Sequence, residues 1–280
     1  MTNTDDLRCV ACDGNLTASA GDDLQCCACG ATFPVVWGVP FIGAYTSEDV
    51  LGLMEIAANA GQRGRFNVSA QTIEGWEALL ADYHAAEDQE AFVAARPDAQ
   101  SPFLANRYGK WLEVTHLTQA IRLRGLKVLD VGAGLGFDSH RLALRGAKVT
   151  ALEFSPVLAE AGRQNLAHIR WIGGLSHVLP FKDASFDAVF CNAALHHMRD
   201  IPAALSEALR VLRPGGWLVT TCDSFRPDSS ADDAELEIFD ADPAVLLGVN
   251  EGVPRWSEFV RTLQQHRDVL DVELFTHTLY

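Results

Sequence analysis

Short apolar runs alternate with amphipathic stretches through the second half of the chain. The runs that start at Val128 and Val149 are rich in β-branched residues, and a further apolar stretch ends at Cys191. Apolar runs bounded by turn residues and separated by helical patterns are typical of buried parallel strands. From residue 201 to 212, apolar side chains recur at helical spacing, and the stop signal Pro214-Gly-Gly follows. The pattern predicts an α/β domain with a mostly parallel sheet.

Two other regions precede this one. Residues 45–105 show helical spacing that ends near Pro97 and Pro102, and we expect them to form a helical linker or lid. A cysteine-rich segment covers residues 1–44. The sequence therefore predicts three parts, with the α/β domain over residues 106–280.

A glycine-rich turn follows the first apolar run. Gly132, Gly134 and Gly136 separate a predicted strand from a predicted helix, and Glu153 ends the next predicted strand. Glycines permit a tight turn and a close approach of ligand to backbone. An acid at the end of the next strand can accept hydrogen bonds from ribose hydroxyls. Together these features predict a nucleotide site.

Two residues indicate which nucleotide. Phe137 occupies the place of the third glycine of a dinucleotide motif, and Asp130 lies two residues before the first glycine. A carboxylate there would repel a pyrophosphate but would attract an ammonium group. S-adenosylmethionine carries an amino group and no phosphate, so these residues favour it over NAD.

With these motifs, residues 107–225 resemble a class I S-adenosylmethionine-dependent methyltransferase. The resemblance rests on blocks in the expected order: residues 128–136, Glu153, residues 179–191, residues 192–197 and residues 209–219. It implies a Rossmann-like methyltransferase fold. The family's sheet ends with an antiparallel strand, whereas only residues 269–275 follow the fifth strand as a strand candidate. We therefore expect the last strand to be lacking or truncated, and the complete protein to be longer.

The resemblance also implies where the cofactor lies. The first block would surround its methionine part, Glu153 would hold the ribose, Phe154 would face the adenine, and Asn192 would lie near the sulfonium. The residues expected from the first block are Asp130, Gly132, Ala133, Gly134 and Gly136. Tyr108 could shape the pocket, although aromatic residues at helical spacing are more often core residues.

One position departs from the family pattern. Members often carry an acid just before Leu-Pro-Phe that binds the adenine amino group, and by position this residue is Leu175. A leucine side chain accepts no hydrogen bond, so adenine recognition would rest on backbone groups, on Ser176 or on apolar packing. The alternative is that the block is shifted by a residue or two.

A hydroxyl acceptor would require a general base. His196 and His197 closely follow the fourth predicted strand, and histidine titrates near neutral pH. We therefore consider this pair as candidate catalytic residues. The competing interpretation is that the pair packs against its neighbours or caps a helix.

The N-terminal segment contains two C-x-x-C knuckles, formed by Cys9, Cys12, Cys26 and Cys29. Their spacing suits a tetrahedral structural Zn²⁺ site with no position left for water. A redox pair or free thiols are the less favoured alternatives. The segment also resembles small zinc-ribbon modules that act as partners or activators of methyltransferases.

Composition narrows the function classes. The 280 residues include 22 basic and 37 acidic side chains, a net charge of −15, which disfavours contact with phosphate backbones. There is no apolar run of membrane-spanning length and no signal-peptide pattern, so we expect a cytoplasmic location and no membrane partner. The oligomeric state stays open.

The leading hypothesis is methylation of oxygen or nitrogen in a small-molecule or glycan-like metabolite. An RNA methyltransferase that holds RNA with the ribbon is one alternative, favoured by the ribbon and opposed by the charge. A non-catalytic cofactor-binding or scaffolding protein is the other, because Leu175 departs from the family pattern.

Overall fold

A computed structural model describes residues 3–19, 21–43, 121–198, 200–221, 223, 225, 254–266 and 268. The predicted lid at residues 45–105, Tyr108 and the strand candidate at 269–275 lie outside these residues. Among the described helices, none has both the length and the apolar character needed to cross a membrane.

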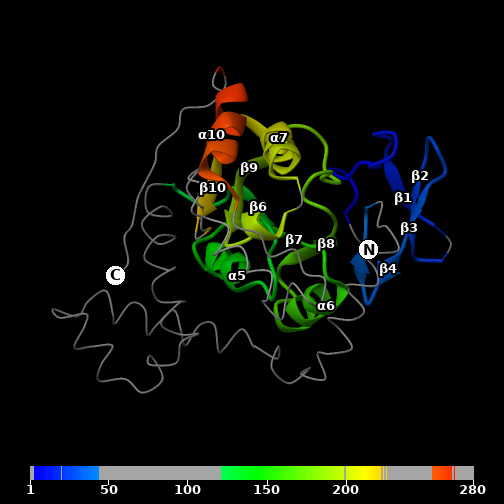
Figure 1. The fold of residues 1–280 in the computed structure, drawn as a ribbon. Coiled ribbons are helices and arrows are strands. Elements are labelled where there is room, and N and C mark those ends of the chain that lie inside the picture. The colour runs from blue at the N-terminus through cyan, green and yellow to red at the C-terminus, as the bar shows by residue number, and fades with distance from the viewer. Residues whose placement is uncertain are drawn as a thin grey trace, which may run out of the picture.

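Five parallel strands form the centre of the molecule (Figure 1). Their bounds are β6 Lys127–Val131, β7 Lys148–Glu153, β8 Arg170–Gly173, β9 Phe186–Asn192 and β10 Leu212–Thr221. The strand order is β10-β9-β6-β7-β8. The predicted parallel sheet is thereby confirmed.

Helices cover both faces of this sheet (Figure 1). Their bounds are α5 Phe137–Leu144, α6 Pro156–Asn165, α7 Ile201–Val211 and α10 Trp256–Gln265. Within β6, Val128 packs on the α5 and α6 side, whereas Leu129 packs on the α7 side. Burial on both faces explains why β6, β7 and β9 are buried along nearly their whole length instead of alternating between buried and exposed positions.

The chain changes direction in the sheet after β8. It builds β6, β7 and β8 in one direction and then crosses to place β9 on the other side of β6. In open α/β sheets, ligands bind at such a switch point, beyond the carboxyl ends of the strands. The topology therefore predicts a ligand site at the carboxyl ends of β6 and β9, where Gly132 and Asn192 lie.

The fifth strand differs from the prediction at its start. β10 begins directly after α7 and runs through Pro214-Gly-Gly, which the sequence suggested as a stop signal between elements. Its pairing with β9 shifts register between Leu212 and Trp217, and Gly215 has a φ of +76°. The helix ends before Pro214-Gly-Gly, as predicted, but these residues form an irregularity within β10 and not a turn between two elements.

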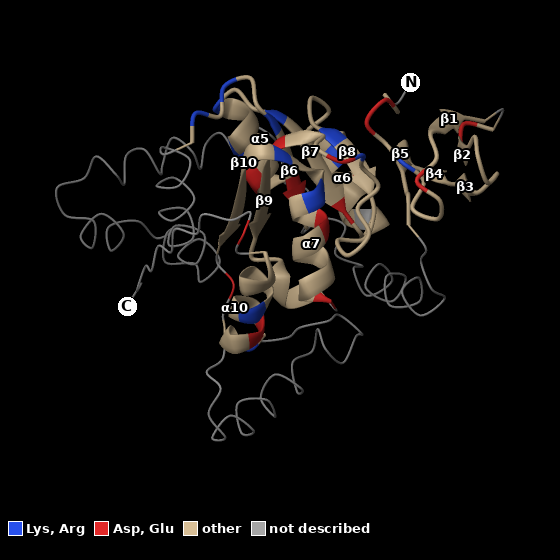
Figure 2. Cartoon of the chain, turned by 90° about the horizontal axis from the view of Figure 1, so that it is seen from above, with Lys and Arg blue, Asp and Glu red and all other residues tan. Residues whose placement is uncertain are grey.

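The N-terminal ribbon is built from very short strands. They are β1 Leu16–Ala18, β2 Leu24–Cys26 and β3 Thr32–Phe33 in one antiparallel sheet, and the hairpin β4 Val35–Val36 with β5 Val39–Pro40. The ribbon lies beside β8 (Figure 1), and its acidic start lies near the basic start of that strand (Figure 2). Both oxygens of Asp6 accept hydrogen bonds from Arg170, at 2.7 and 2.8 Å.

Candidate functional site

The glycine turn brings the backbone to the switch point. Gly132, Gly134 and Gly136 all have φ between +56° and +83°, a region that favours glycine. A Cβ on Gly132 would lie 2.6 Å from Cβ of Ala194, and one on Gly136 would lie 2.8 Å from the Trp171 ring. Among the described residues, none apart from its two chain neighbours comes within 4 Å of a Cβ placed on Gly134. The outer two glycines therefore allow close packing, and no described residue covers the middle one.

Glu153 ties the end of β7 to this turn. Its Oε2 accepts a hydrogen bond from the Gly134 amide at 2.7 Å, and its Oε1 accepts one from the Ser155 amide at 2.8 Å. Burial raises the pKa of Glu153, while the two backbone amides oppose that change. The carboxylate lies at the carboxyl end of β7, and Phe154 beside it is 39% exposed.

Asp130 is a buried acid at the end of β6. The Ser139 hydroxyl donates a hydrogen bond to its Oδ2 at 2.6 Å. Burial, together with the charges of Asp138 and Glu153, raises the pKa of Asp130 to about 7. A bare carboxylate is disfavoured here, so an approaching cation would find a strong partner.

Asn192 is held from two sides. Its Nδ2 donates to Oδ2 of Asp138 at 2.5 Å, and its Oδ1 accepts from the Thr221 hydroxyl at 2.7 Å. These bonds connect α5, β9 and β10 across the switch point. The prediction named Asn192 but missed Asp138 and Thr221, because neither lies in a motif and only the fold brings them to it.

His196 has a buried carboxylate partner. Its Nδ1 lies 2.7 Å from Oδ1 of Asp223, whose side chain is 2% exposed, and its backbone amide also approaches that oxygen. The other oxygen, Oδ2, is buried and has no hydrogen-bond partner among the described residues. Sequence reasoning missed Asp223, although an acid just after the fifth strand is a signal that could have found it.

The two candidate histidines have different environments. The ring of His197 contacts that of His196 with centroids 4.0 Å apart, but His197 is exposed. The orienting carboxylate makes His196 the stronger candidate for a base.

Leu175 and Ser176 follow β8 and are partly exposed. Leu175 forms an isolated bridge with Val178, which closes a tight turn. The structure thus places both predicted adenine neighbours on one turn beyond the carboxyl end of β8. Tyr108, the remaining predicted cofactor residue, lies outside the described residues.

The four knuckle cysteines converge. Their sulfur atoms all lie within 4.8 Å of one another, with Cys9 and Cys29 at 3.7 Å and Cys12 and Cys26 at 3.5 Å. Tetrahedral coordination with Zn–S bonds of about 2.3 Å requires sulfur atoms about 3.8 Å apart. The cluster therefore has the dimensions of a four-thiolate metal site.

The surroundings of the cluster also suit a metal. The Ala11 and Ala28 amides each point at a cysteine sulfur at 3.4 Å. Backbone amides, that of Cys29 first, lower the pKa of Cys26 to about 6, which favours the thiolate that binds metals. A Cβ on Gly14 would lie 2.8 Å from the Cys26 sulfur, so this glycine leaves room for the cluster.

Comparison with known proteins identifies the central part of the chain. Residues 129–220 match the family model described as a methyltransferase domain. Demethylmenaquinone methyltransferase of Renibacterium salmoninarum is 43% identical over 95 residues, covering 34% of this chain and 40% of the relative. Malonyl-[acyl-carrier protein] O-methyltransferase of Erwinia pyrifoliae is 42% identical over 94 residues, covering 34% and 36%.

The chain spans about two fifths of the length of these relatives. Among solved structures, a putative methyltransferase from Bacillus halodurans aligns with a TM-score of 0.48 and 24% identity, over 55% of this chain and 68% of that one. The predicted Rossmann-like methyltransferase fold is confirmed, and residues 129–220 form a region similar to a methyltransferase domain.

Proposed function

We propose that the protein is an S-adenosylmethionine-dependent methyltransferase whose acceptor is an oxygen or nitrogen of a small-molecule or glycan-like metabolite. The observation that carries this proposal is the pair of buried acids, Asp130 and Glu153, around the glycine turn at the switch point. The match of residues 129–220 to a methyltransferase domain supports it.

The residues present fit this cofactor. The Asp130 carboxyl is buried and its pKa is raised to about 7, so an ammonium group would stabilise its charged form. The Glu153 carboxylate accepts two backbone amides, and a carboxylate has about four lone-pair sites, which leaves capacity for ribose hydroxyls. No described residue covers Gly134, which leaves room beside both acids.

When bound, S-adenosylmethionine would supply the activated methyl group. Asn192 is fixed by Asp138 and Thr221 beside the glycine turn, so it can orient groups there without rotating. His196, with Nδ1 donating to Asp223, would present Nε2 as the acceptor for a proton from a hydroxyl or ammonium group. Asp223 would then stabilise the charged imidazolium.

The charges of the site favour an acceptor that is neutral when the methyl group is transferred, including an amine that enters as its ammonium form and loses a proton first. Asp130, Asp138 and Asp223 gather around the ends of β6 and β9, and a polyanion would meet their repulsion. This supports a small metabolite over RNA, as does the formal net charge of −15. The names of the two relatives, a quinone-type and an acyl-carrier substrate, are compatible with a small acceptor.

We also propose that Cys9, Cys12, Cys26 and Cys29 hold a structural Zn²⁺ ion. The sulfur distances and the amides directed at them support this assignment. A cytoplasmic location, where thiols stay reduced, would suit such a site.

The proposed activity requires cofactor binding that depends on Glu153. We expect calorimetry to show binding of S-adenosylmethionine, and Glu153→Ala to weaken it by about tenfold to a hundredfold, since charge-assisted hydrogen bonds contribute about 1.5–3 kcal/mol. Glu160→Ala, on the same side of the sheet in α6, is the matched control and should leave affinity unchanged. Absence of binding to the wild-type chain would exclude the enzyme and leave a scaffolding role.

Asp130 makes cofactor affinity depend on pH. Its pKa in the free protein is raised to about 7, and an ammonium group favours the charged form, so binding should release a proton near neutral pH. Affinity should rise from about pH 5.5 to about pH 7, a range in which the ligand's α-amino group stays protonated. Calorimetry in buffers of different ionisation enthalpy measures the proton release. Asp130→Asn should bind more weakly and without this pH dependence; an unchanged slope would assign the proton to another group.

His196 should be held in one tautomer by Asp223. Long-range proton–nitrogen NMR on the neutral wild-type protein should show Nδ1 protonated and Nε2 bare, because the carboxylate accepts the Nδ1 proton. Asp223→Ala should abolish this preference at His196. If the tautomer stays the same in that variant, Asp223 does not orient the ring.

Metal analysis tests the zinc assignment. We expect about one Zn²⁺ per chain, lost in Cys9→Ser because a three-thiolate remnant binds metal more weakly. Cys27→Ser is the matched control: this cysteine lies in the same segment but outside the cluster, with its sulfur near the Thr17 hydroxyl. Equal metal content in both variants would refute the assignment.

A further inference from the structure

The ribbon contacts the loop between β8 and β9 at the point where the loop begins. The Ile42 amide donates to the Gly173 carbonyl at 2.8 Å, and Phe41 forms a parallel bridge with the same residue. The Phe41 ring takes the space of a side chain at Gly173, since a Cβ there would lie 2.1 Å from Cδ1 of the ring. This contact fixes the backbone directly before Leu175.

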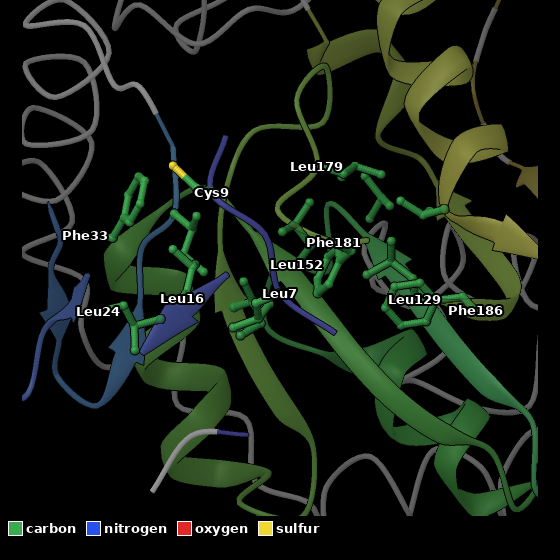
Figure 3. Packing of buried hydrophobic residues seen from close by; sticks show 14 of the residues in the cluster. Leu7, Cys9, Leu16, Leu24, Phe33, Leu129, Leu152, Leu179, Phe181 and Phe186 are labelled. Carbon is green, nitrogen blue, oxygen red and sulfur yellow. The ribbon is translucent and has the colours of Figure 1, made fainter. Parts of the chain in front are cut away.

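A second ribbon segment contacts the loop beyond Leu175 and Ser176. The Arg8 amide donates to the Pro180 carbonyl at 3.0 Å, and the Lys182 amide donates to the Asp6 carbonyl at 2.9 Å. Between them, Leu7 forms an antiparallel bridge with Phe181, and both side chains are fully buried (Figure 3). Residues 6–8 therefore act as an added short strand on residues 180–182.

The side chain of Arg8 extends this contact toward α7. Its Nε donates to the Leu179 carbonyl at 3.3 Å, and its Nη2 donates to Oε2 of Glu207 at 3.1 Å. The same Glu207 oxygen accepts the Leu179 amide at 2.8 Å. The Leu179 carbonyl also accepts a hydrogen bond from Nη2 of Arg210 at 3.1 Å, so Arg8 shares this carbonyl with a residue of α7. Arg8 is the ribbon's own contribution to this network, and it directly precedes Cys9.

The ribbon depends on its cysteine cluster to hold these positions. Its strands have only two or three residues, and its share of the core is small: Leu7, Cys9, Leu16, Leu24, Cys26, Phe33 and Ile42. Modules of about 40 residues usually need a metal or disulfides to fold. Loss of the metal would remove the link between Cys9 and the rest of the cluster, directly beside residues 6–8.

We propose that metal occupancy of the ribbon is coupled to S-adenosylmethionine binding through the β8–β9 loop, with Arg8 and Phe41 as positioning residues. The inference rests on the proposed function. Leu175 and Ser176 lie between the two contacts, so the ribbon sets the backbone on the expected adenine side of the site. The Leu175 side chain cannot accept a hydrogen bond, so recognition of the adenine there would depend on where the backbone groups lie. Coupling between two binding sites is reciprocal, so the cofactor should also retain the metal.

Two substitutions test the positioning role in the zinc-loaded protein. Arg8→Ala and Phe41→Ala should each weaken S-adenosylmethionine binding by about tenfold in calorimetry while the metal content stays at the wild-type level. Cys27→Ser is the matched control, because this cysteine lies in the ribbon but outside both contacts with the loop, with its sulfur near the Thr17 hydroxyl. It should leave both metal content and cofactor affinity unchanged.

The reciprocal experiment uses the wild-type protein. We expect saturating S-adenosylmethionine to slow the release of zinc to a chromogenic chelator by about tenfold, and Arg8→Ala to remove this protection. If the wild type binds cofactor but Arg8→Ala binds equally well and protection persists, the coupling is refuted while the proposed function stands. If the wild type binds no cofactor, the proposed function itself fails. A chelator rate that is the same with and without bound cofactor would also overturn the coupling.

Discussion

Carboxylates buried at the carboxyl ends of the strands are the constraint on which the site depends. Asp130 is the second-last residue of β6, Glu153 ends β7 and Asp223 follows β10. An uncompensated buried charge costs several kcal/mol, so each acid requires donors or a cation. Glu153 obtains two backbone amides, one of which only the glycine turn can supply. Asp223 obtains His196. The glycine turn and His196 thus meet the same requirement, because each supplies a hydrogen-bond donor to a buried carboxylate.

The ribbon and the sheet share a single hydrophobic cluster. Leu7 and Phe33 of the ribbon belong to the same buried group as Leu152 and Phe181 of the larger part (Figure 3). Packing of this kind stabilises both parts together, because neither surface could face water without losing the free energy of apolar burial. The ribbon therefore extends the hydrophobic core of the sheet. A substitution that disturbs packing in one part should also destabilise the other.

Local signals explain what the sequence could predict. The apolar runs, the Gly132–Gly136 turn and the cysteine spacing each report a structure formed by nearby residues, and the parallel sheet and the converging thiols follow from them. Asp223 and Thr221 escaped prediction because their partners depend on two strands meeting across the switch point. The Leu7–Phe181 pairing joins residues far apart in sequence, and no periodic pattern encodes such a contact.

The same negative charges constrain the proposed reaction. Burial, with the charges of Asp223 and Asp130, raises the pKa of the Cys191 thiol well above its ordinary value, so the field of the acids reaches the end of β9. Methyl transfer from a sulfonium moves positive charge onto the acceptor atom. Acids close to that atom stabilise the charge as it arrives, provided that the acceptor is neutral beforehand. An anionic acceptor would lose more by repulsion on entry than it gains in transfer. In the proposed reaction the buried acids would thus favour a neutral hydroxyl or amine as the acceptor, and His196 would receive the proton that such an acceptor must lose.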